Sequence, residues 1–189
     1  PNVLFVAIDD LNDWVGVFEG NPQVKTPNLD KFNQRGGLVM YDAHTPSTVC
    51  GPSRSSILTG KCPHSTGVYG NKTNLRDAPK ARDLLTLPQY FSKHGYHSLS
   101  RGTIFHAHTL KGNERGDQGQ WAFDEWHAAD GWAGPISKDR PVNGLPNLPG
   151  EKGYHSTGCD WGPTGGNDET KLKDYQTALW AVEHFRDRQ

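Results

Sequence analysis

The segment from Cys50 to Gly60 brings a thiol, a helix start and a cation together within eleven residues, Cys-Gly-Pro-Ser-Arg-Ser-Ser-Ile-Leu-Thr-Gly. Pro52 suits the first turn of a helix and Gly60 suits the C-terminal cap, which predicts a helix over residues 52–59 with Cys50 just ahead of it. Backbone N–H groups at a helix start favour an anion, and Arg54 can reach the same place from the first turn. The segment therefore predicts an anion site around a reactive residue.

A second chemical feature is the pair of adjacent carboxylates Asp9 and Asp10, which follows the apolar run of residues 3–8. That run predicts a buried strand with both faces covered. Open α/β sheets bind their ligands at the carboxyl ends of strands, and adjacent carboxylates repel each other unless a cation or proton lies between them. A hard divalent ion is thus a natural occupant, although an Asp-Asp pair also commonly marks a turn or a helix cap.

Histidines offer a third possible chemistry, because His94 and His97 or His106 and His108 have spacings that could suit zinc. No Cys-x-x-Cys or His-Glu-x-x-His pattern accompanies them, so a zinc site is not predicted. Of these histidines, only His106 is kept as a candidate site residue.

The elements that must position these residues alternate between strands and helices. Strands are predicted over residues 3–8, 38–41 and 96–100, and helices over residues 27–35, 52–59, about 87–94 and 169–186. This alternation indicates an α/β fold with a mostly parallel sheet.

Two later regions complete the sequence-based outline. Residues 107–168 are rich in Gly, Pro, Trp and His without clear periodicity, and we interpret them as long loops on the substrate side. The last helix carries an apolar stripe at Leu172, Tyr175, Leu179 and Val182, and a further strand is expected after it. We therefore interpret residues 1–189 as the N-terminal part of a larger catalytic domain.

Composition narrows the class of protein. The formal net charge is −1 over 189 residues, so the sequence shows no basic excess of the kind that indicates nucleic-acid binding. No apolar run has the length of a membrane span. Only three cysteines are present, Cys50, Cys62 and Cys159, which excludes a disulfide framework. The chain opens directly on a predicted core strand, so we expect a removed leader and an exported protein: periplasmic, secreted or lysosomal. Asn71-Lys72-Thr73 fits a glycosylation sequon.

The segment that begins at Cys50 resembles the signature of the type I sulfatases, C-x-P-S-R-x-x-x-L-T-G. All its fixed positions are matched, by Cys50, Pro52, Ser53, Arg54, Leu58, Thr59 and Gly60. The resemblance implies an alkaline-phosphatase-like α/β fold in which a mostly parallel central sheet is flanked by helices, here incomplete. It also implies that a formylglycine-generating enzyme oxidises Cys50 to formylglycine, and that Asp9 and Asp10 bind calcium together with residue 50.

Residues 95–106 resemble a second sulfatase motif, G-Y-x-T-x-x-x-G-K-x-x-H, of the branch similar to iduronate-2-sulfatases. Gly95, Tyr96, Gly102 and His106 match, and Thr103 stands at the lysine position. The resemblance implies that His106 contacts a formylglycine hydroxyl. For the missing lysine three explanations stay open: Arg101 or another cation substitutes, the subgroup works with threonine, or the protein is catalytically weak.

The resemblance as a whole implies a sulfate-ester hydrolase with Cys50, Arg54 and His106 as catalytic residues. The expected substrate is a sulfated carbohydrate, because Trp121, Trp126, Trp132 and Trp161 in the predicted loops suit stacking on sugar rings. The family's other ligands come from the later half of its fold, so we expect a C-terminal segment or a second chain to complete the site. The alternatives are a phosphonate or phosphodiester hydrolase of the same superfamily and a non-catalytic protein that binds sulfated glycans.

Overall fold

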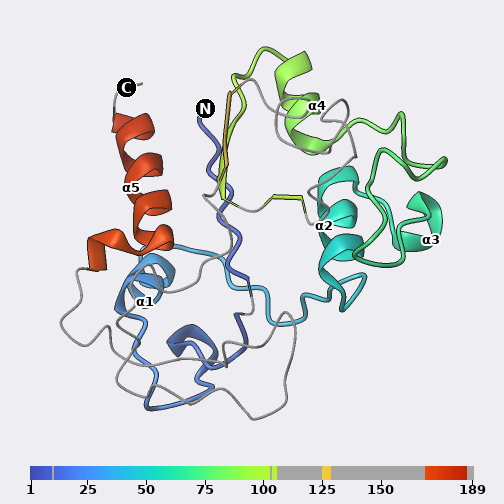
Figure 1. The fold of residues 1–189 in the computed structure, drawn as a ribbon. Coiled ribbons are helices and arrows are strands. Elements are labelled where there is room, and N and C mark those ends of the chain that lie inside the picture. The colour runs from blue at the N-terminus through green and yellow to red at the C-terminus, as the bar shows by residue number, and fades with distance from the viewer. Residues whose placement is uncertain (10, 103, 106–124, 129–168, 187–189) are drawn as a thin grey trace, which may run out of the picture. The chain divides into compact units, whose positions relative to one another are not determined.

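The computed structural model describes residues 1–9, 11–102, 104–105, 125–128 and 169–186 (Figure 1). The chain divides into two compact units, residues 1–45 and 46–189, and each is described by itself. No helix in the described ranges has both the length and the mean hydropathy that a membrane crossing needs.

Unit 1 contains the short 3₁₀-helix η1 (Gly16–Phe18) and helix α1 (Pro27–Gln34). The predicted helix over residues 27–35 is thus confirmed, with Gly36 at φ 97° after its end. Thr26 joins the two elements, because its Oγ1 accepts the N–H of Gly16 at 2.9 Å and donates to Asp30 Oδ1 at 3.3 Å.

The strands predicted over residues 3–8 and 38–41 are not formed in unit 1. Residues 3–8 and 38–40 have no regular secondary structure, and Val3, Leu4, Phe5, Val6 and Ile8 are 54–68% exposed. The buried-strand prediction for 3–8 is therefore wrong here. A parallel strand exists only through hydrogen bonds to a neighbour, and no part of the described chain pairs with either segment.

In unit 2, helices α2 (Cys50–Thr59) and α3 (Pro63–Thr66) follow one another closely, and α4 (Leu87–Lys93) comes after a long turn-rich segment. Helix α2 begins two residues earlier than predicted and ends, as predicted, at Gly60, whose φ of 66° is left-handed. The predicted helix near residues 87–94 is confirmed, whereas α3 was not expected from the sequence.

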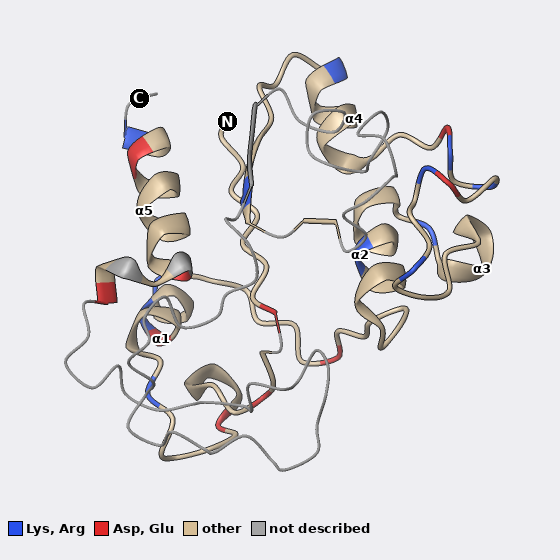
Figure 2. Ribbon diagram, viewed as in Figure 1, with Lys and Arg blue, Asp and Glu red and all other residues tan. Residues whose placement is uncertain are grey.

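Helix α4 begins with a capping box. Thr86 is the N-cap residue and is fully buried, and its N–H donates to Gln89 Oε1 at 2.9 Å. Arg76 reinforces this start, because its guanidinium donates to Gln89 Oε1 at 3.1 Å and to the carbonyl oxygens of Arg82 and Leu84 at 2.9 and 2.7 Å. Positive and negative side chains are interspersed along the segment between α3 and α4 (Figure 2).

The core of unit 2 lies beside α2, which contacts both α3 and α4. Its buried apolar side chains come from α2, from the turns before α4 and from residue 105. They are Leu58, Val68, Leu75, Ala78, Ala81 and Phe105. This cluster fixes α2 in place, and the candidate site lies at the start of α2.

Strand β1 (Leu99–Gly102) pairs in parallel with β2 (Glu125–Ala128), and Leu99 is opposite Glu125. The parallel pairing agrees with the predicted α/β class. β1 begins three residues later than the predicted start at residue 96, and β2 lies inside the region interpreted as loops, so that interpretation is wrong at residues 125–128. Residues 107–124 and 129–168 lie outside the described ranges.

The C-terminal segment forms a 3₁₀ turn, η3 (Glu169–Lys171), followed by α5 (Lys173–Arg186), where a single helix was predicted. Helix α5 contacts β1. Thr177, Trp180, Ala181 and His184 are half-buried, whereas the predicted apolar stripe of Leu172, Tyr175, Leu179 and Val182 is 39–51% exposed. The apolar stripe is therefore left uncovered by the described part of the chain.

Candidate active site

Cys50 is the first residue of α2 and is exposed as a free thiol. Val49 precedes it in the extended conformation, and the first helical hydrogen bond runs from the N–H of Ser53 to the carbonyl oxygen of Val49 at 3.0 Å. The predicted position of the thiol at a helix start is confirmed, although Cys50 lies inside the first turn and not ahead of it.

The remaining N–H groups of this first turn have different partners. The N–H of Val49 donates to Ser47 Oγ at 3.3 Å, and that of Gly51 donates to Asn71 Oδ1 at 2.7 Å. Pro52 has no N–H, so nothing is lost at its fully buried position. Within the described ranges, the N–H of Cys50 forms no hydrogen bond.

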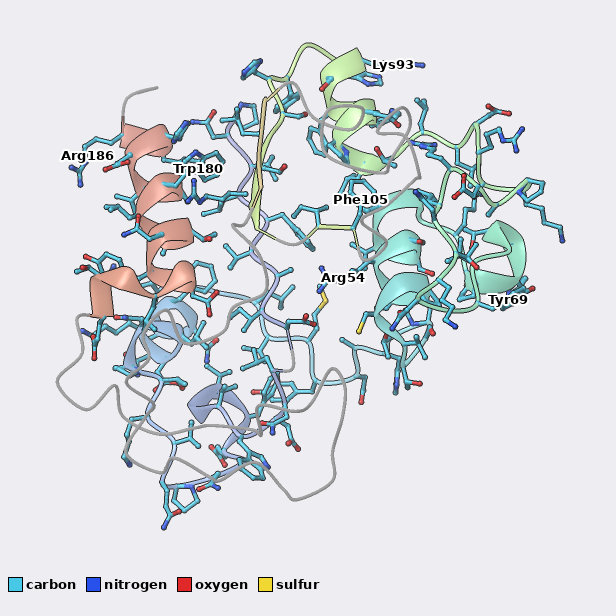
Figure 3. The ribbon with its side chains drawn as sticks, viewed as in Figure 1. Arg54, Tyr69, Lys93, Phe105, Trp180 and Arg186 are labelled. Atoms are coloured by element: carbon cyan, nitrogen blue, oxygen red, sulfur yellow. The ribbon has the colours of Figure 1, made fainter. Side chains whose placement is uncertain are left out.

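Arg54 projects from the same helix start and is half-buried (Figure 3). One guanidinium nitrogen donates to the carbonyl oxygen of Ile104 at 3.5 Å, a contact across fifty positions of sequence. The neighbouring Phe105 is buried in the same cluster as Leu58 of α2. The structure thus brings the segment of the first motif next to the segment of the second.

Two residues of the second motif, Thr103 and His106, are outside the part of the chain that the structure describes. The positions of their neighbours are known: Gly102 ends β1 with φ 94°, and Ile104 and Phe105 lie against α2. The catalytic role of His106 and the effect of Thr103 remain predictions.

Asp9 is exposed in unit 1, and Asp10 belongs to the residues that are not described. Cys50 belongs to unit 2. Among the described residues, no group of three or more acidic, histidine or cysteine side chains gathers as a metal site. The predicted ligand set of Asp9, Asp10 and residue 50 therefore stays a prediction.

Sequence reasoning missed one residue at this site. The sequence distinguishes Asn71 only as part of the sequon Asn71-Lys72-Thr73, yet its side chain reaches the first turn of α2. Gly70-Asn71 is a typical turn pair, which indicates a loop at this point but not which helix the loop contacts.

The family model that matches this chain and three of its relatives carry sulfatase names. The family model described as "Sulfatase" matches residues 1–179. A protein named "Sulfatase" from Formosa agariphila is 38% identical over 191 residues, which cover 98% of this chain and 36% of the relative. Human "Iduronate 2-sulfatase" is 33% identical over 126 residues, covering 67% of this chain and 22% of the relative.

Human "N-acetylgalactosamine-6-sulfatase" is 30% identical over 136 residues, covering 67% of this chain and 25% of the relative. The chain spans about a quarter to a third of the length of these relatives. No solved structure matches it significantly.

Proposed function

This chain belongs to the sulfatase family, and we propose that it supplies the N-terminal part of an enzyme that removes sulfate from a sulfated carbohydrate. The observation that carries the proposal is the first turn of α2. It combines an exposed Cys50 with Arg54, and both lie within a complete match to the sulfatase signature.

Cys50 is the proposed precursor of the nucleophile. After oxidation to formylglycine, its hydrate offers one hydroxyl oxygen that attacks the sulfur of the ester, and the alcohol leaves in line. The second hydroxyl then loses its proton, the C–O bond to sulfate breaks, and the aldehyde forms again. Exposure of residue 50 gives a substrate access to this atom.

Arg54 is the proposed partner of the gem-diol and of the negative charge near it. Its side chain is half-buried, and one guanidinium nitrogen contacts the carbonyl oxygen of Ile104 at 3.5 Å. A fixed cation in such a place stabilises charge without reorganising at the moment of reaction. His106 follows Ile104 by two residues, and we propose that it positions or deprotonates a hydroxyl of residue 50.

Asp9 and Asp10 are the proposed metal ligands, together with residue 50. Adjacent carboxylates form a hard oxygen donor set that suits calcium, and Asp9 is exposed enough to bind an ion. When bound, the ion would supply Lewis-acid stabilisation and orient the nucleophile.

A sulfated sugar is the proposed substrate class. Two of the matched relatives carry the names of sulfatases of sugars, iduronate and N-acetylgalactosamine, and four tryptophans lie in the region between β1 and α5. Sugar rings stack favourably on such side chains.

We also propose that a C-terminal segment or a second chain completes the site, and that the protein is exported and matures with a formylglycine-generating enzyme. The chain matches only 36% of the length of the Formosa agariphila relative, which supports the proposal that another segment or chain completes the site. So do the exposed apolar side chains of residues 3–8, since large apolar patches mark surfaces that another segment covers.

The experiment that tests the proposal compares ester classes. The complete protein, co-expressed with the maturation enzyme, is assayed with p-nitrophenyl sulfate and with p-nitrophenyl phenylphosphonate, and intact mass of the Cys50 peptide reports its oxidation. Faster sulfate turnover, lost in Cys50→Ala, is the expected result. Faster phosphonate turnover would make the protein a phosphonate hydrolase, and binding of a sulfated glycan without turnover of either ester would make it a non-catalytic relative.

A further inference from the structure

We infer that Asn71 is a positioning residue for the chemistry at residue 50 and acts through the N–H of Gly51. The catalytic meaning of this inference rests on the proposed function. The contact itself is a property of the fold, because Asn71 lies twenty positions after Gly51 and reaches it from the loop that follows α3.

The hydrogen bond from Gly51 to Asn71 Oδ1 is short, at 2.7 Å. A helix start leaves N–H groups without partners inside the helix, and the preceding side chain usually accepts one of them. Here the N-cap residue is Val49, which has no acceptor in its side chain. Asn71 supplies the cap from another segment, so the first turn of α2 depends on a tertiary contact.

The absence of a side chain at Gly51 makes this contact possible. Gly51 is buried, and a Cβ at this position would lie 3.1 Å from Asn71 Oδ1, 3.1 Å from the carbonyl oxygen of Gly70 and 3.2 Å from Asn71 Cα. Two of these three atoms are backbone atoms, which do not turn aside as a side chain does. The loop at Asn71 is therefore packed directly on the peptide unit next to Cys50.

That peptide unit is part of the site. The planar amide that joins residues 50 and 51 contains the N–H that Asn71 accepts, so the hydrogen bond restricts rotation about the Cα–C bond of Cys50. Asn71 also contributes no charge. A carboxylate could accept the same bond, but it would place a negative charge beside the reacting sulfate, which is itself an anion.

Three variants of the complete protein separate this role from a purely structural one. Asn71→Ala removes the cap, and Asn71→Asp keeps an acceptor and adds charge. Gly60→Ala is the matched control, because it strains the opposite end of the same helix, where a Cβ meets no atom within 4 Å. Thermal unfolding ranks the three variants by stability.

Two readouts then address residue 50. With the matured protein and p-nitrophenyl sulfate, we expect kcat to fall about 10–100-fold in Asn71→Ala, with KM little changed. We expect Asn71→Asp to regain stability but not kcat, and Gly60→Ala to lose stability while its kcat stays at the wild-type value. An Asn71→Ala kcat equal to that of Gly60→Ala, or an Asn71→Asp kcat equal to wild type, would overturn the inference.

The second readout needs no sulfatase activity. In protein made without the maturation enzyme, the alkylation of Cys50 by iodoacetamide is measured by mass spectrometry relative to Cys62, the other exposed thiol in the described ranges. We expect this ratio to fall severalfold in Asn71→Ala and to stay unchanged in Gly60→Ala. An unchanged or higher ratio in Asn71→Ala overturns the inference. A wild type that hydrolyses no sulfate ester contradicts the proposed function and leaves this readout valid.

Discussion

Cys50 combines exposure with a position in the first turn of α2, so its replacement is expected to change chemistry more than stability. Cys50→Ser removes the thiol that is the proposed precursor of formylglycine. We expect turnover of p-nitrophenyl sulfate to fall by at least about 10³-fold. Steady-state assays and the thermal unfolding temperature measure the two effects. Cys62→Ser is the control at another exposed thiol and should retain full activity; an active Cys50→Ala enzyme, which has no nucleophilic side chain at this position, would rule out residue 50 as the nucleophile.

A substitution at Arg54 separates the effect of the shape of its side chain on catalysis from the effect of its positive charge. Arg54→Lys keeps the positive charge but loses the planar guanidinium that contacts the carbonyl oxygen of Ile104. We expect kcat/KM for p-nitrophenyl sulfate to fall about 10²–10³-fold, the usual effect of losing one oriented donor. Wild-type kcat/KM in Arg54→Lys would show that only the charge matters.

The proposed metal site is testable through Asp9. We expect chelation to abolish sulfatase activity and calcium to restore it, and we expect Asp9→Asn to need a higher calcium concentration for half-maximal rate because one anionic oxygen is lost. A calcium titration of activity measures this shift, with Asp13→Asn as the control at a nearby carboxylate. Full activity of the chelated enzyme would contradict the metal assignment.

Helix α2 ends at a residue whose backbone conformation restricts the side chain. Gly60 has φ 66°, and a Cβ at this position would meet no atom within 4 Å, so Gly60→Ala adds backbone strain without a clash. We expect it to lower the free energy of unfolding by about 1–2 kcal/mol, and Gly60→Asn by less, because asparagine tolerates the left-handed region better. Urea denaturation measures both; equal losses would point to a contact and not to backbone strain.

Helix α4 depends on its capping box. Thr86 is fully buried and accepts and donates at the helix start, so Thr86→Ala is expected to cost about 1 kcal/mol of unfolding free energy. Thr86→Ser retains the hydroxyl and is the matched control. Urea denaturation of the two variants should separate them, and a Thr86→Ser loss as large as that of Thr86→Ala would assign the effect to the lost methyl group.

The described part of the chain leaves apolar side chains exposed on residues 3–8 of unit 1 and along the stripe of α5 in unit 2. If a further segment covers these surfaces, the amides of residues 3–8 should exchange slowly in the complete protein and fast in residues 1–189 alone. Hydrogen-exchange mass spectrometry compares the two, with the amides of α2 as an internal reference. Fast exchange of residues 3–8 in both proteins would contradict the proposed completion.

Local signals explain which elements were predictable. Pro27, Pro52 and the Thr86 capping box mark helix starts, and Gly36, Gly60 and Gly95 mark helix ends; these signals act within a few residues, so α1, α2 and α4 were expected nearly in place. Strands need partners that are distant in sequence. The run of residues 3–8 was therefore predicted as a strand from its composition alone, while β2 was missed.

The sequence by itself determined the family, the residue proposed as nucleophile and the helix that carries it, because all three are written in consecutive residues from Cys50 to Gly60. Only the tertiary structure decided which distant residues support that helix. The contacts of Gly51 with Asn71 and of Arg54 with Ile104 join positions twenty and fifty residues apart. Such pairings follow from how the loops pack around the core, and no local pattern of residue types specifies them.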